Sequence, residues 1–94
     1  MIAQSVWERA QAGDSRALDD LARAYHPLVG RIVRKFARRL PPHADWAELE
    51  SAGNAGLLRA LLGYDPTSPV QFEAYAQAII RSTLLDSLRA QDWA

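Results

Sequence analysis

The stretch that decides the fold runs from Asp45 to Trp93 and reads DWAELESAGNAGLLRALLGYDPTSPVQFEAYAQAIIRSTLLDSLRAQDW. On both sides of a short turn, Gly63-Tyr64-Asp65-Pro66, apolar residues recur at steps of three and four, which is the spacing of an amphipathic helix. Strand-like alternation is absent from both sides, and Gly and Pro fall mainly at boundaries. The pattern therefore predicts two helices joined by a turn.

Start signals place both helices more closely. Asp45 stands three residues before Glu48, as in a capping box, and this pair begins the first helix. For the second helix, Ser68 is the expected cap, Pro69 lies in the first turn and Gln71 is the partner in a capping box. The packing stripe of the second helix, which ends near Gln91, consists of Phe72, Tyr75, Ala76, Ile79, Ile80, Thr83, Leu84 and Leu88.

The preceding residues carry three more helical segments. Ser5 and Glu8 have capping-box spacing and begin the first of them, and Asp14 caps the second. Pro27 suits the first turn of a third helix, because a proline there loses no helical hydrogen bond. Pro41-Pro42 ends that helix, since proline cannot continue it and restrains the residue before it.

Length and composition describe a small single domain. We expect residues 1–94 to form one compact all-α bundle of about five helices. The absence of Cys excludes disulfides, and two His give no basis for a metal site. No apolar run approaches the roughly 18 residues that span a bilayer, and no secretory signal opens the chain. We expect a soluble, cytoplasmic protein without metal, cofactor or membrane partner. With no nucleophile, acid–base pair or phosphate loop evident, we do not expect an enzyme.

Several short motifs together point to a family. They are Ala52-Gly53-Asn54-Ala55-Gly56-Leu57-Leu58, Tyr64-Asp65-Pro66, Gln71-Phe72-Glu73, and Leu85-Asp86 with Leu88-Arg89. In this order and spacing the chain, from about Tyr25 to Ala94, resembles the second conserved region of bacterial RNA polymerase sigma factors. The flagellar and sporulation-type alternative factors are the most similar. In that family, the region binds the polymerase core and opens the promoter. The resemblance implies N-terminal helices over residues 1–26, and core-binding and promoter-melting helices over residues 27–94.

The resemblance implies a polymerase-binding surface on the helix that begins at Asp45. In the family, this helix packs on a coiled-coil hairpin of the largest polymerase subunit. Matched by position, the contact residues are Glu48, Ser51, Ala52, Asn54 and Leu58. Ser51 replaces a longer amide and Ala52 often a carboxylate, which weakens the expected contact. Alternatively, Gly53 and Gly56 serve only close packing against the helix that begins at Pro27.

A second implied surface reads promoter DNA. In the family, the last helix stacks on unpaired bases of the single-stranded −10 element and reads them, a task that suits aromatic and cationic side chains. By position this face comprises Gln71, Tyr75, Ala78, Ile79, Ser82, Leu85 and Asp86, with Arg81 and Arg89 as remaining phosphate contacts. The chain departs from the family at Ser68, Pro69, Val70 and Ile79, where cations and an aromatic are usual. The position of Tyr75 is equally consistent with a ring that stacks on a base and with a ring that packs in the core.

Basic residues gather in one segment although the net charge is zero. Residues 27–43 carry five bases and no acid, namely Arg31, Arg34, Lys35, Arg38 and Arg39. This face could hold a DNA backbone or the polymerase. Since Phe36 belongs to the apolar side and no aromatic residue shares the side of the bases, a solvated helix face is the better interpretation.

Other functions remain open. The departures from the family favour a sigma-like interaction module that binds polymerase or an anti-sigma factor without reading DNA. An unrelated DNA-binding domain would need a short recognition helix rich in Arg, Asn or Gln, and none is evident. Family members continue past Asp92-Trp93 into further domains, so we expect either a fragment of a longer factor or a stand-alone sigma-like protein.

Overall fold

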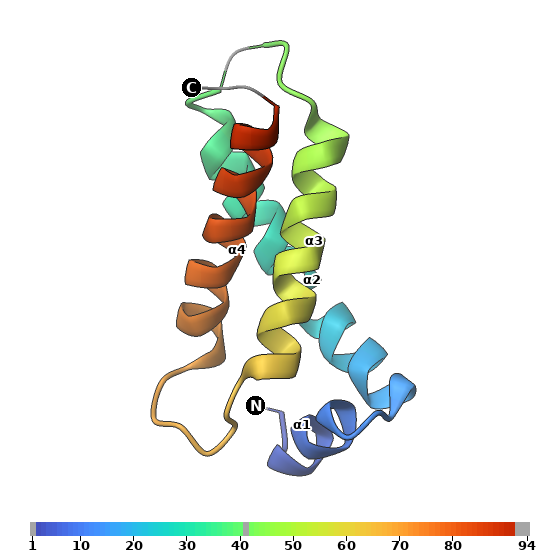
Figure 1. The fold of residues 1–94 in the computed structure, drawn as a ribbon. Helices are drawn as coiled ribbons and strands as arrows, with labels where there is room; N and C mark the ends of the chain where they lie inside the picture. Colours follow the sequence, from blue (N-terminus) through green and yellow to red (C-terminus); the bar gives the residue numbers. More distant parts are fainter. Residues whose placement is uncertain (1, 41, 92–94) are drawn as a thin grey trace.

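The computed structural model describes residues 2–40 and 42–91, and these ranges contain four α-helices and no strand (Figure 1). The helices are α1 (Gln4–Gln11), α2 (Ser15–Ala37), α3 (Trp46–Gly63) and α4 (Phe72–Ala90). The predicted all-α fold is confirmed, with four helices in place of about five. α2 ends at Ala37, before the predicted end at Pro41-Pro42, and residues 38–40 form a turn. The Asp92-Trp93 motif lies outside the described residues.

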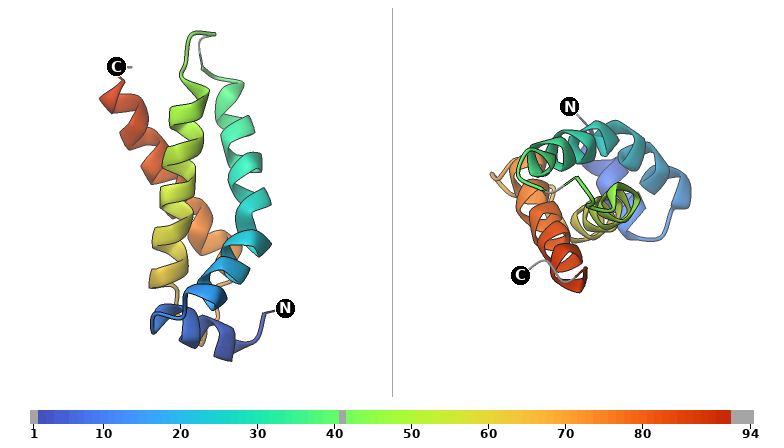
Figure 2. Two further views of the ribbon diagram at one scale, coloured as in Figure 1. Left: turned by 90° about the vertical axis from the view of Figure 1, so that its right-hand side faces the viewer. Right: turned by 90° about the horizontal axis from the view of Figure 1, so that it is seen from above.

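The difference in number arises at Pro27, which lies inside α2 and does not begin a new helix. Proline lacks an amide hydrogen and its ring crowds the carbonyl one turn earlier, so it bends or breaks a helix. Here α2 bends near its middle and then continues (Figure 2). Leu21 and Leu28, on either side of the bend, are both buried. Burial of the same apolar stripe before and after Pro27 keeps the two segments in one helix.

Two of the predicted helix caps are confirmed. The Asp14 carboxylate accepts hydrogen bonds from the backbone amides of Arg16 and Ala17 at the start of α2. The Asp45 carboxylate accepts one from the amide of Glu48 at the start of α3, over 3.1 Å. These caps depend only on neighbours in sequence, and they satisfy amides that have no partner within the helix.

The predicted cap of α1 is wrong by two residues. The helix begins at Gln4 after Ala3, whose side chain makes no capping hydrogen bond, and Ser5 lies inside it. The Gln4 side-chain amide donates a hydrogen bond to the Glu8 carboxylate over 2.9 Å, one turn later. Glu8 is thus the hydrogen-bond partner of Gln4, whereas the capping-box spacing had paired Glu8 with Ser5.

The predicted start of α4 is wrong by several residues. Ser68 and Pro69 lie in the connecting loop, and Gln71 takes the cap position without a side-chain hydrogen bond. The Ser68 hydroxyl accepts a hydrogen bond from the Val70 amide over 3.1 Å, which closes a local turn and not a helix. α4 begins at Phe72, whose ring is buried.

The centre of the bundle is the pair α3 and α4, which lie side by side and run in opposite directions (Figure 1). α2 packs against both of them. The buried side chains of this core are Leu21, Leu28, Val29, Ile32 and Val33 from α2, Leu49, Leu57, Ala60 and Leu61 from α3, and Phe72, Ala76, Ile80, Leu84 and Leu88 from α4. Within the described ranges, no helix combines the length and apolar character needed to cross a membrane.

α1 closes one end of the bundle through an aromatic cluster. Trp7 anchors this helix and is only 4% exposed. Its ring centroid lies 4.9 Å from those of Tyr64 and Phe72 and 6.0 Å from that of Tyr25. The Gln11 side-chain amide adds hydrogen bonds to the backbone carbonyls of Leu61 and Tyr64, over 3.0 and 2.6 Å. Four elements distant in sequence therefore meet at this end.

Candidate functional site

α3 presents a largely exposed face opposite its core face. Glu48, Ser51 and Asn54 are exposed, and Leu58 is 45% exposed although it is aliphatic. Residues three and four apart share one face of a helix, so Glu48, Ser51 and Leu58 lie along one side, with Asn54 at its margin. Ala52 is partly buried and packs against the core, and therefore contributes least to this face.

Leu62 extends the face and was missed in the sequence interpretation. It is 48% exposed and stands four residues after Leu58, on the same side of α3. An aliphatic residue one turn beyond a predicted contact residue is the signal that could have identified it. Together, Leu58 and Leu62 give the face an apolar centre beside polar Ser51 and Glu48.

The two glycines of α3 point away from this face and into the core. A Cβ on Gly53 would lie 2.8 Å from Val29 Cγ1 of α2. A Cβ on Gly56 would lie 2.5 Å from Thr83 Oγ1 and 3.0 Å from Ile80 Cα of α4. Close packing against α2, which was predicted as one role of the glycines, is confirmed for Gly53. Gly56 instead allows α4 to approach α3 closely. The glycines fix the depth of α3 in the bundle and so decide which of its residues remain outside.

The predicted reading face of α4 is partly exposed and partly packed. Gln71, Ala78, Ser82 and Asp86 are exposed, and Leu85 is 41% exposed. These residues, with Tyr75 and Ile79, fall on one side of α4 by helical spacing. Asp86 pairs with Arg89 over 2.8 Å, so the carboxylate and one cation of this side neutralise each other.

Tyr75 and Ile79 are the packed members of the face, since both are partly buried against the core. The Tyr75 ring lies 5.5 Å from that of Tyr64, and its hydroxyl would be 2.8 Å from a Cβ on Gly63. One side of the ring therefore rests on the end of α3 while part of it stays accessible.

Arg81 does not share this side of α4. Its guanidinium carbon lies 5.8 Å from the centroid of the Phe36 ring of α2, in a cation–π contact. Arg81 is thus directed toward α2 and, of the other predicted DNA contacts, lies beside Leu85.

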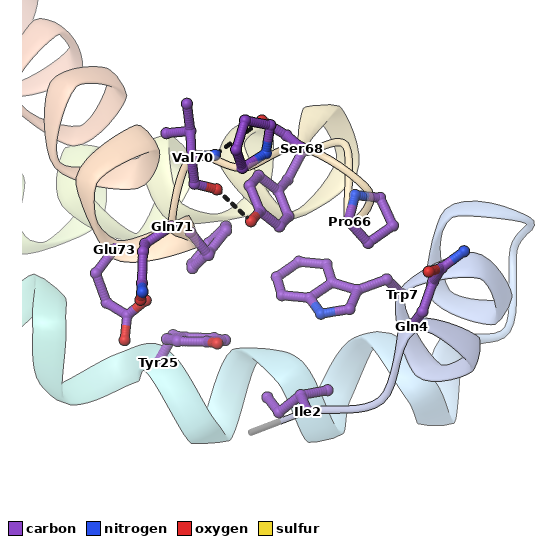
Figure 3. Close-up of a pocket in the computed structure, with 12 residues that line it drawn as sticks. Ile2, Gln4, Trp7, Tyr25, Pro66, Ser68, Val70, Gln71 and Glu73 are labelled. Atoms are coloured by element: carbon purple, nitrogen blue, oxygen red, sulfur yellow. Dashed lines mark hydrogen bonds between the residues drawn. The ribbon is translucent and has the colours of Figure 1, made fainter.

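A pocket of about 450 Å³ lies where α1, α2 and the loop before α4 meet (Figure 3). Rings from Trp7, Tyr25, Tyr64 and Phe72 line it, with polar groups from Gln71 and Glu73 at its edge. The Tyr64 hydroxyl donates a hydrogen bond to the Val70 carbonyl over 2.6 Å and ties the loop to the pocket wall. The sequence interpretation missed this pocket, because its rings come from distant segments.

Two groups near the pocket have shifted acidities. Burial raises the pKa of Tyr25 above its ordinary value of 10.0, and the nearby Glu73 carboxylate and Tyr64 raise it further. In the loop, hydrogen bonds from the hydroxyl and the amide of Thr67 lower the pKa of Asp65. Tyr25 therefore stays neutral in the pocket wall at neutral pH, and Asp65 stays ionised. Within residues 2–40 and 42–91, no group of three or more His, Cys, Asp or Glu could hold a metal ion.

Comparison with known proteins agrees with the resemblance. The family model for Sigma-70 region 2 matches residues 21–94. The RNA polymerase sigma-D factor of Bacillus subtilis (strain 168) is 38% identical over 91 residues, which are 96% of this chain and 36% of that protein. The RNA polymerase sigma factor FliA of Pseudomonas aeruginosa is 39% identical over 89 residues, 95% of this chain and 35% of that protein. The chain thus spans about a third of the length of these curated relatives. Since the family model covers most of the chain, the predicted relationship is confirmed, and the chain belongs to the Sigma-70 region 2 family.

Proposed function

We propose that this chain acts in transcription initiation as a sigma factor domain that binds RNA polymerase core and captures the opened promoter −10 element. The observation that carries the proposal is the match of residues 21–94 to Sigma-70 region 2, together with relatives named as RNA polymerase sigma factors. Because bacterial RNA polymerase works in the cytoplasm, the proposal includes a cytoplasmic location.

Polymerase binding is assigned to the exposed face of α3, made up of Glu48, Ser51, Asn54, Leu58 and Leu62. Two exposed leucines one turn apart are costly to leave in water, and a coiled-coil partner can bury them. Polar Glu48 and Ser51 beside them suit the rim of such a contact. The proposed partner is the coiled-coil hairpin of the largest subunit, and an anti-sigma factor that covers the same leucines would compete with it.

DNA capture is assigned to α4, with Tyr75 as the ring that stacks on a base. The exposed polar side chains of Gln71 and Ser82 lie on the same side, within reach of base edges. The aromatic pocket beside the start of α4 adds a second place that could hold an unstacked base, since base–aromatic stacking tolerates any sequence. Zero net charge means little counterion release, so we expect weak binding by the chain alone and a preference for single strands.

A test of this function uses a fluorescent oligonucleotide that carries a flagellar-type −10 element, as a single strand and as a duplex. Fluorescence anisotropy is measured at low salt with the chain alone, core polymerase alone, and both together. We expect that only the mixture binds the single strand tightly. Tight duplex binding by the chain alone, with a steep salt dependence, would instead indicate an unrelated DNA-binding domain.

A specific observation supports a second candidate, an interaction module that binds polymerase without reading DNA. Ile79 is partly buried, Arg81 is turned toward Phe36, and Arg89 is paired with Asp86, so α4 has few cations for phosphates. Under this alternative the chain still binds core polymerase, but adding it does not raise the affinity of the mixture for the single strand.

A further inference from the structure

A groove of about 510 Å³ lies between the C-terminal parts of α2 and α4, whose ends diverge (Figure 2). It belongs neither to the exposed face of α3 nor to the aromatic pocket. Its lining residues are Ile32, Lys35, Phe36, Arg38, Arg39 and Leu40 from α2 and the turn after it, and Gln77, Arg81, Leu85 and Leu88 from α4.

The rim of the groove is strongly basic. Lys35, Arg38, Arg39 and Arg81 are all exposed, and none of the described lining residues carries a carboxylate. Across residues 2–40 and 42–91, the ion pairs are Arg9 with Asp14 and Arg89 with Asp86. No carboxylate in those ranges therefore pairs with any of the four groove cations. Four like charges around one concavity raise the local positive potential, although the net charge of the chain is zero.

The floor of the groove is apolar and mainly aliphatic. Leu40 and Leu85 are accessible, and Ile32 and Leu88 lie beneath them in the core. Among the described lining residues the single aromatic ring is that of Phe36, and the Arg81 guanidinium already lies over it. A floor of this kind can bury aliphatic side chains of a partner, but it offers no free ring on which a base could stack.

The geometry points to a docking site for an acidic amphipathic helix of a partner protein. Gln77, Arg81 and Leu85 follow one another at four-residue steps, so the groove accompanies α4 for about 12 Å, at 1.5 Å per residue. That length matches roughly two turns of a docked helix, with leucine-like anchors at i, i+3 and i+7. Carboxylates beside these anchors would meet the basic rim, and the complementary charge steers the encounter. This site lies outside the exposed face of α3, and it shares only Leu85 and Arg81 with the predicted DNA contacts of α4.

The experiment uses the 94-residue chain and a synthetic probe. The probe is a fluorescein-labelled 18-residue peptide with leucines on one helical face and glutamates on the other, compared with a scrambled isomer of the same composition. We expect the amphipathic peptide to bind the chain better than its isomer does. Lys35→Glu with Arg39→Glu should weaken that binding at least about tenfold, and Leu85→Ser should weaken it without changing any charge.

The matched control is Arg31→Glu with Arg34→Glu, which reverses two charges on the same helix outside the groove lining. We expect this variant to bind the peptide within about twofold of the parent chain. Equal losses in both double variants, or equal binding of the scrambled isomer, would mean general charge attraction and overturn the proposal. A single-stranded oligothymidine that displaces the peptide more strongly than unlabelled peptide would assign the groove to nucleic acid. Circular dichroism melting of each variant ensures that folded proteins are compared.

Discussion

Gly56 on α3 lies so close to Ile80 on α4 that a Cβ on the glycine would be 3.0 Å from the Ile80 Cα. The nearby Thr83 hydroxyl is held by its hydrogen bond to the Ile80 carbonyl, over 2.8 Å, and a Cβ would meet it at 2.5 Å. A backbone atom cannot rotate away as the end of a flexible side chain can. The separation of the two central helices is therefore set by the missing side chain of Gly56.

Gly56→Ala should therefore destabilise the fold although alanine favours helix. The gain in helix propensity is ~1 kcal/mol, whereas overpacking of a close contact costs ~1–3 kcal/mol. We expect a net loss of up to about 2 kcal/mol in the free energy of unfolding, measured by urea denaturation.

The control for this change is Gly30→Ala in α2. A Cβ there would meet only the end of the Arg34 side chain, at an ordinary contact distance of 3.4 Å. This variant should gain about 0.5–1 kcal/mol from helix propensity. If both variants gain stability equally, α3 and α4 are not held at the described separation.

Tyr75 should contribute both to stability and to strand binding, because its ring packs on the end of α3 and remains partly accessible. Tyr75→Ala should cost about 1–3 kcal/mol of stability, less than for a fully buried ring. In the complex with core polymerase, it should also cost ~1–3 kcal/mol of single-strand affinity. Tyr75→Phe retains the ring and should change both quantities little. Normal strand binding by the folded fraction of Tyr75→Ala would remove Tyr75 from the proposed site.

Tyr25 should make the fold sensitive to high pH. Burial, Glu73 and Tyr64 raise the pKa of Tyr25 in the folded state, so that state holds the phenol proton more tightly than the unfolded chain does. The contribution to stability is complete below about pH 10 and is lost as the pH rises through the folded pKa. Urea unfolding at several pH values above about 9 should show a steeper decline for the parent chain than for Tyr25→Phe. Parallel declines would mean that Tyr25 ionises alike in both states.

Local signals in the sequence predicted the parts of the fold that depend on near neighbours. The Asp14 and Asp45 caps are correct because each carboxylate binds amides two or three residues further on. The family motifs likewise located α3, α4 and the loop between them. The exposure of Asn54 and Leu58 follows from the helical period, since Gly53 and Leu57 beside them are buried.

The errors arise where tertiary packing overrides local preference. Pro27 favours a helix start, but burial of Leu21 and Leu28 on the two sides carries α2 through it. Ser68 has the chemistry of a helix cap, yet α4 begins at Phe72, where the buried ring joins the cluster around Trp7. The aromatic pocket has no local signature, because it combines side chains from segments far apart in sequence. For the basic groove, the run of bases in residues 27–43 marks one wall, but nothing local marks the wall that α4 provides.

The exposed face of α3 is the proposed binding surface for RNA polymerase core, and an affinity measurement with a charged variant of that face tests the assignment. Core enzyme is immobilised, and binding of the parent chain is compared with that of Asn54→Ala with Leu58→Glu, which places an unpaired carboxylate in the proposed contact. Ala24→Glu, an exposed position on α2, adds the same charge elsewhere and serves as the control. We predict that the parent and control bind equally and that the double variant loses at least about tenfold in affinity, or ~1.4 kcal/mol. Unchanged binding of the folded double variant would contradict the account.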